Sequence, residues 1–234
     1  MHGKKLGAIA VTGFAVAMLL GVACHAFAQD AKPSYPNMAP LDQYLMNDRA
    51  AEIAMARSAA PESISRDAEI LVLGPHGYET AVQGKNGFVC LVERSWTAPL
   101  DDPNFWNPKL RGPLCLNAAA AHSYLPRTIM KTNLILADRT KDQMAQAIVA
   151  AIEKKELPAM EPGAMSYMLS KQGYLGDQAG HWHPHLMFFF SDTDPAVWGA
   201  DLPDSPVLSI NDKWEHLITF LVPVREWSDG TPDR

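Results

Sequence analysis

Three histidines alternate within five residues, in the segment His181-Trp182-His183-Pro184-His185. In an extended chain, alternate side chains point to the same side and are separated by about 6.7 Å. Two imidazoles at this spacing can bind one metal ion, because zinc–nitrogen bonds are about 2.0–2.1 Å long and each ring extends the reach. Three cannot do so in a straight strand, because the outer pair would lie about 13 Å apart. The segment therefore predicts a mononuclear site built on two neighbouring histidines.

The other ligands of such a site must come from elsewhere in the chain, and His216 is the first candidate. Asp192, His76 and Glu79 are further candidates. We therefore expect a divalent metal such as zinc to be bound by members of one set of four histidines: His181, His183, His185 and His216. A neutral imidazole also titrates near pH 7, so these side chains could act as general bases without a metal. The alternative is that they only bond carbonyls and carboxylates at a strand end.

Pro184 favours an extended conformation at His183 and removes a backbone donor. We therefore expect this segment at a sheet edge or a strand entrance, where a ligand can reach it. Trp182, Trp198 and Trp214 could form an apolar wall beside it. These features support a second hypothesis, a non-catalytic module that binds a small molecule or a partner in the cell envelope.

Two carboxylates, Glu79 and Glu93, flank a predicted turn and could act as an acid–base pair. Glutamates are rarely buried without a partner, so we expect both to be solvated strand residues. The motifs Gly-x-Ser-x-Gly, Ser-x-x-Lys and the Walker loop are absent from the sequence. Their absence disfavours common hydrolases and nucleotide enzymes. The sequence therefore leaves open whether the protein is an enzyme.

The N-terminal residues have the three parts of a secretory signal peptide. Lys4 and Lys5 are followed by an apolar stretch over 6–23, and Ala26 and Ala28 place small residues at the cleavage site. One alternative, a membrane anchor, is disfavoured because three glycines dilute the stretch and no basic cluster follows it. A second alternative, a lipoprotein processed at Cys24, is disfavoured because Gly21 stands where such a site usually has Leu. We expect residues 1–28 to be removed and the protein to be periplasmic or secreted.

Cys24 would leave with the signal peptide, so Cys90 and Cys115 remain. An even pair of cysteines in an exported chain predicts a disulfide, worth about 3 kcal/mol for a loop of this length. Two buried free thiols, or Cys90 as a nucleophile, are the alternatives. An oxidising compartment disfavours thiol catalysis.

The chain has 234 residues and a formal net charge of −6, with acidic residues scattered along it. This pattern favours solubility, and no basic face that would bind nucleic acid is visible. No later apolar run approaches the ~20 residues that span a bilayer. We therefore expect no nucleic-acid partner and no membrane span after signal removal. The oligomeric state is not predicted.

The strands are expected in two groups. Residues 69–73, 78–83 and 87–93 predict a three-stranded antiparallel meander, because Asn86-Gly87 suits a hairpin turn. Further strands are expected over 165–169, 185–190, 207–210 and 217–224. The run at 185–190 is apolar on both faces, which is typical of a central strand.

Helices are expected over 41–60, 114–124 and 140–156, and Thr140 with Gln143 predicts a capping box at the start of the last. Strands and helices do not alternate regularly, which favours an α+β domain with a mainly antiparallel sheet and helices packed on one side. The expected organisation is a proline-containing arm at 29–40, a single globular domain at 41–227 and a polar, frayed tail at 228–234.

Overall fold

One eight-stranded sheet organises the structure, a computed structural model that describes residues 35–176 and 182–234. The strand order is β2-β1-β3-β4-β5-β6-β8-β7, and every neighbouring pair is antiparallel except β1 with β3. The strands are β1 Glu69–Gly74, β2 Gly77–Val82, β3 Val89–Glu93, β4 Gly112–Leu116, β5 Met165–Met168, β6 His185–Ser191, β7 Leu208–Asp212 and β8 Leu217–Pro223. The predicted single α+β domain with a mainly antiparallel sheet is confirmed.

The helices are short, and side chains cap the N-termini of α1, α3 and α5. They are α1 Arg49–Arg57, α2 Glu62–Ser65, α3 Ala118–Ser123, α4 Leu125–Leu136 and α5 Lys141–Glu153, with 3-10 turns η1 Leu41–Gln43, η2 Ser95–Thr97 and η3 Pro195–Trp198. The capping box of Thr140 and Gln143 is present at the start of α5. The helix expected over 41–60 begins only after Asp48, whose carboxylate accepts from the first backbone N–H groups of α1. The helix expected over 114–124 is instead strand β4 followed by α3.

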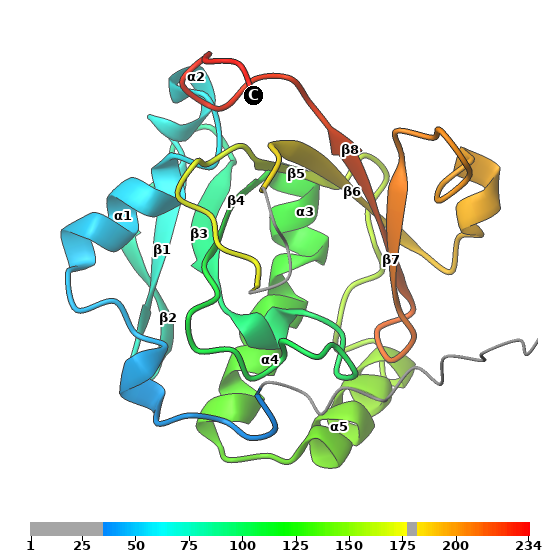
Figure 1. The fold of residues 1–234 in the computed structure, drawn as a ribbon. Coiled ribbons are helices and arrows are strands. Elements are labelled where there is room, and N and C mark those ends of the chain that lie inside the picture. The colour runs from blue at the N-terminus through cyan, green and yellow to red at the C-terminus, as the bar shows by residue number, and fades with distance from the viewer. Residues whose placement is uncertain (1–34, 177–181) are drawn as a thin grey trace, which may run out of the picture. The chain divides into compact units, whose positions relative to one another are not determined.

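Helices cover both faces of the sheet, which corrects the expectation that they pack on one side (Figure 1). The end of α1 packs through Ala56 on the face that carries Cys90 and Val92. Tyr124, between α3 and α4, packs with Leu91 on the opposite face. Successive residues of a strand point to opposite faces, and β3 is buried on both. Both faces therefore need cover.

The predicted meander over 69–93 is wrong in its last strand, because β3 pairs in parallel with β1 and not with β2. The connection after β2 runs back past the start of β1, where Lys85 N donates to Asp67 O over 2.7 Å. A Cβ on Gly84 would lie 2.3 Å from the backbone nitrogen of Glu69. Glycine at position 84 thus permits this close crossing, which the Asn86-Gly87 turn alone did not predict.

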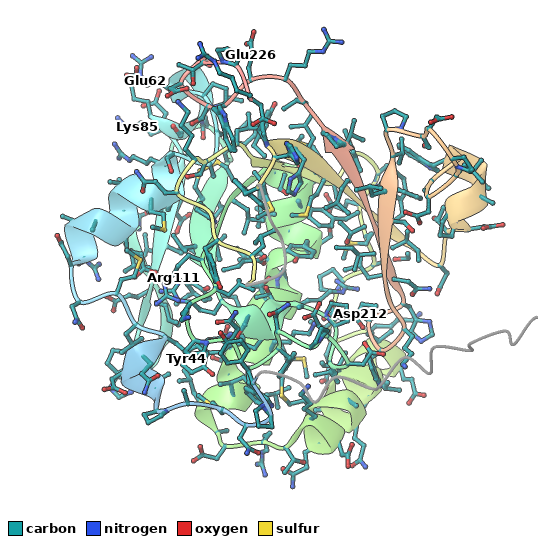
Figure 2. The ribbon with its side chains drawn as sticks, viewed as in Figure 1. Tyr44, Glu62, Lys85, Arg111, Asp212 and Glu226 are labelled. Carbon is teal, nitrogen blue, oxygen red and sulfur yellow. A yellow bond between two sulfur atoms is a disulfide. The ribbon has the colours of Figure 1, made fainter. Side chains whose placement is uncertain are left out.

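The C-terminal residues pack on the domain, contrary to the frayed tail expected over 228–234. Trp227 is buried, and Ser228 N donates to Leu169 O over 2.9 Å. Lys171 pairs with Asp229 at 2.7 Å. Figure 2 labels Glu226, which lies just before this segment in the chain.

Cys90 and Cys115 lie opposite each other on β3 and β4 and are joined by a disulfide, as predicted. Both are fully buried. Within 35–176 and 182–234, no helix has the length and apolar character needed to cross a membrane.

Candidate functional site

The sheet curves around α3 and α4 (Figure 1) and, with α4 and the loop after β3, encloses a cavity of about 250 Å³. Residues from six consecutive strands form the sheet side of this cavity. They are Glu93, Gly112, Met168, His185, Met187, Leu221, Thr219, Leu217, Ile210 and Asp212. On each strand that contributes more than one residue, the lining positions are two apart, so they share one face. We call this space the central cavity.

Gly112 keeps the sheet wall of the central cavity open. A Cβ at this position would lie 3.4 Å from Met168 Cε and 3.6 Å from Glu93 Cβ. A larger side chain on Gly112 would therefore fill part of the cavity, while the flexible end of Met168 could move aside.

Lys131 of α4 contacts both the loop after β3 and the segment from the end of β7 to β8, at one side of the cavity. Its Nζ donates to Asp212 at 3.1 Å, to Glu215, and to the carbonyls of Thr97 and Ala98 at 3.2 and 3.1 Å. Burial by itself lowers the pKa of Lys131, but the charges of Glu215 and Asp212 outweigh this and raise it. Asp212, labelled in Figure 2, lies at the end of β7. Lys131 is therefore a charged ammonium held by two carboxylates.

The two arginines of the cavity lining also have acidic partners. Arg127 Nε lies 3.8 Å from Glu215, and Arg94 pairs with Glu52 at 2.8 Å. With Lys131 and Asp212, this makes three cations that face three carboxylates. The buried charges of these six groups balance.

Glu93 is not part of this balance. Its Oε1 accepts from the Tyr124 hydroxyl at 3.2 Å and the Thr128 hydroxyl at 3.1 Å, and its side chain is buried. Burial raises the pKa of Glu93 to about 7, against hydrogen bonds from Thr128, Tyr124 and Thr97 and the charge of Lys131, which lower it. The expectation that Glu93 is solvated is therefore wrong. It is a proton-exchanging carboxyl group near neutral pH.

His185 offers an unused hydrogen-bond acceptor in the lining. Its Nδ1 lies 2.9 Å from the carbonyl of His183, which can only accept, so Nδ1 carries the proton. Burial lowers the pKa of His185, so the ring is neutral and Nε2 presents a lone pair. The residue is 6% exposed, and among the described residues Nε2 has no hydrogen-bond partner.

The structure does not bring the predicted metal ligands together. His183 is exposed and lies 2.6 Å from Asp233, whereas His185 is buried. His216 lies at the other end of the β6–β8 ladder, since His185 pairs with Pro223 and Leu217 with Ser191. His181 lies outside the described residues. In the part of the chain that is described, no three His, Cys, Asp or Glu residues are grouped to hold a metal ion.

Two features separate these histidines: strand β6 begins only after Pro184, and His216 lies in the turn between β7 and β8. Strand β6 begins only at His185, so the strict alternation assumed for His183 and His185 does not hold across Pro184. The segment is a strand entrance, as expected, but β6 is an interior strand and not an edge. His216 has a positive φ in the β7–β8 turn and contacts Asp192 at 3.0 Å.

The three tryptophans also do not form one wall. Trp182 packs edge-on against His185, with ring centroids 4.9 Å apart, and its indole N–H donates to Ser170 O. Trp198 instead stacks on Phe220, and Trp214 packs near a separate cluster around Trp96 and Phe105. Only Trp182 therefore borders the candidate site.

Comparison of the chain with protein-family models, with characterised proteins and with solved structures finds no match. The chemistry of the central cavity therefore rests on its own residues. They offer an apolar enclosure, a carboxyl group that exchanges protons near pH 7, and a neutral imidazole acceptor. Such a set can bind a small molecule that donates hydrogen bonds.

Proposed function

We propose that the protein is an exported small-molecule-binding protein whose ligand occupies the central cavity. The observation that carries this proposal is His185 Nε2, a buried acceptor that has no partner among residues 35–176 and 182–234 and belongs to the lining of a cavity of about 250 Å³. Buried polar atoms in proteins are almost always hydrogen-bonded, and leaving one unsatisfied costs about 1–3 kcal/mol. A bound molecule with an N–H or O–H group would remove this cost.

The rest of the lining supports a ligand with an apolar body. Apolar side chains come from the sheet and from the loop after β3, among them Pro99, Leu110, Met168, Leu175, Met187, Leu217 and Leu221. Small-molecule sites are typically apolar enclosures of about 300–1,000 Å³ with a few polar groups that orient the ligand. The volume of the central cavity is close to the lower end of this range, which suits a small ligand.

The proposal of export rests on the N-terminal sequence and on the disulfide. Lys4, Lys5 and the apolar stretch over 6–23 are typical of a signal peptide, and a Cys90–Cys115 bridge is typical of oxidising compartments. We expect the protein isolated from the periplasm or the medium to begin at Gln29. N-terminal sequencing checks this, and a chain that keeps residues 1–28 in that fraction contradicts it.

Binding in the central cavity is tested by narrowing it. N-phenyl-1-naphthylamine, an uncharged aromatic probe with one N–H donor, should give a saturable fluorescence increase with the native protein. Gly112→Val should raise the Kd of the probe by about tenfold or more, equivalent to about 1.4 kcal/mol, because the added side chain occupies cavity space. The measurement is a fluorescence titration of both proteins.

Gly74→Val is the matched control, because a Cβ on Gly74 meets nothing closer than 3.7 Å and the residue lies outside the cavity lining. It should bind the probe as the native protein does. If Gly112→Val also binds like the native protein, the central cavity is not the binding site and the proposal fails.

A further inference from the structure

We infer that the ligand of the central cavity is a small organic amine, whose ammonium group pairs with Glu93 and whose apolar body fills the remaining space. This inference rests on the proposed function, since it names the class of ligand for the same cavity.

The cations of the cavity lining already have acidic partners. They are Arg94, Arg127 and Lys131, which face Glu52, Asp212 and Glu215. Lys131 also uses two backbone carbonyls, so its donors are occupied. Arg127 Nε has only the contact of 3.8 Å to Glu215. An anionic ligand would therefore have to compete with carboxylates that are already in place.

Two acceptors of the lining lack a cationic partner, and two further buried polar atoms there, Arg127 Nε and the Ser95 hydroxyl, have no hydrogen-bond partner among the described residues. Glu93 has no ion-pair partner among the described residues, and His185 Nε2 has no donor. Asp102, which is also in the lining, accepts from Asn104 N at 2.7 Å and interacts with the charge of Lys141, so it is not an unused group. Glu93 and His185 Nε2 thus favour a ligand that brings hydrogen-bond donors and positive charge.

Hydroxyl groups lie around Glu93. Tyr124 and Thr128 donate to the same oxygen, Oε1, at 3.2 and 3.1 Å. These donors favour the ionised carboxylate, while burial opposes it. An ammonium group would supply the missing counter-charge, and charge-assisted hydrogen bonds are roughly twice as strong as neutral ones. An alcohol of the same shape would leave the carboxyl group without that counter-charge.

Forming this ion pair changes the number of protons bound to the protein. The amine binds as its ammonium ion, and the Glu93 carboxyl must lose its proton to the solvent to form the ion pair. Because burial raises the pKa of Glu93 to about 7, the Kd for an amine should rise by about tenfold for each pH unit below 7 and level off above it. Binding at pH 6 should therefore release close to one proton, and binding at pH 8 almost none.

The experiment is isothermal titration calorimetry with 2-phenylethylamine, 2-phenylethanol and 3-phenylpropanoate, at pH 6 and pH 8, in two buffers that differ in ionisation enthalpy. At pH 8, the native protein should bind the amine at least about tenfold more tightly than the alcohol, a preference of about 1.4 kcal/mol. The carboxylate should bind most weakly. The dependence of the heat on the buffer at pH 6 measures the released proton.

Glu93→Gln should abolish both the preference for the amine and the proton release. Glu69→Gln is the matched control, because Glu69 is also a strand glutamate that accepts from a threonine hydroxyl, Thr80 at 2.8 Å, but lies outside the cavity lining. It should behave as the native protein. If Glu93→Gln does not fold, the proton release and pH profile of the native protein decide the question.

The outcomes separate the two proposals. If N-phenyl-1-naphthylamine binds in the cavity but the native protein shows no preference for the amine, or binds the carboxylate best, the inference is overturned and the proposed function stands. The inference is also overturned if Glu93→Gln keeps the amine preference. If none of the probes binds, the proposed function fails and the amine inference fails with it.

Discussion

Glu93 is held in the cavity wall by hydroxyl groups and not by a cation. Tyr124 and Thr128 both donate to its Oε1, and the nearest buried ammonium, Lys131, is engaged by Asp212 and Glu215. A buried carboxyl group in this position changes its charge at a pH where most glutamates are fully ionised. The residue therefore links the proposed ligand binding to protonation and stability.

The first prediction concerns stability and pH. The pKa of Glu93 is raised from 4.5 to about 7 in the folded protein, so its favourable contribution is fully present below pH 4.5 and is lost as the pH rises towards 7 and beyond. At about 1.4 kcal/mol per pH unit, the loss is roughly 3 kcal/mol at most. Glu93→Gln cannot ionise, so relative to the native protein its free energy of unfolding should improve between pH 4.5 and pH 8.

Urea denaturation of both proteins at several pH values measures this difference. His185, whose lowered pKa makes the native protein less stable as the pH falls below 6.5, is present in both and cancels in the comparison. Glu69→Gln should show no such pH-dependent difference. Parallel pH profiles for Glu93→Gln and the native protein contradict the prediction.

At the scale of elements, a disulfide joins the neighbouring strands β3 and β4. Cys90 and Cys115 are directly opposite in the ladder and 25 residues apart in sequence. Glu93 and Gly112, which line the cavity, are the opposed pair at the end of the same ladder. The disulfide therefore stabilises the two strands that position part of the proposed binding site.

The second prediction is that replacing both cysteines by alanine lowers the free energy of unfolding by about 3 kcal/mol, because the bridge no longer restricts the unfolded chain. Urea denaturation of the native protein and the double variant measures the loss. Mass spectrometry after alkylation supplies the control, since the unreduced, denatured native protein should take up no label at Cys90 or Cys115. Labelling of both residues contradicts the pairing.

At the scale of the whole molecule, the central cavity exists because segments far apart in sequence are held together by buried charge. Lys131 of α4 contacts Asp212, which is 81 residues away at the end of β7, and the carbonyls of the loop after β3. These contacts join the helix, the loop and the last hairpin around the same space. Loss of one partner would leave uncompensated charge inside the protein.

The third prediction is that Lys131→Met lowers the free energy of unfolding by about 3–5 kcal/mol, because Asp212 then lacks its counter-charge and, among the described residues, Glu215 keeps only Arg127 at 3.8 Å. Lys213→Met is the matched control, since Lys213 pairs with Asp101 at 3.0 Å on the surface with a side chain 64% exposed. Its effect should stay within about 1 kcal/mol. Equal losses in the two variants, measured by urea denaturation, contradict a structural role of the buried cluster.

Local sequence patterns by themselves determined several elements of this protein. The Thr140–Gln143 box defines the start of α5, and the apolar run after Pro184 correctly predicted β6 as an interior strand. The cysteine pair was also predicted. The capping box and the strand depend on side chains that are near one another in sequence, and only two cysteines remain to pair after signal removal. These features can therefore be predicted without the tertiary structure.

Helix α4 was not predicted, because its buried side chains are largely polar. Arg127, Thr128, Lys131 and Thr132 occupy positions where an apolar stripe would normally mark a helix. Without α4, the partners of Glu93 were unknown, and a solvated side chain was the reasonable expectation. Hydroxyl groups 31 and 35 residues away determine its environment.

Only the tertiary structure decided which histidine faces the cavity and which strands are neighbours. His183, His185 and His216 are separated because β6 starts after Pro184 and because β6 and β8 run antiparallel, which places His216 at the far end. The parallel pairing of β3 with β1 depends on a crossing at Gly84. Strand pairing, burial and charge compensation arise from contacts between distant segments, and local periodicity carries no information about which distant segments meet.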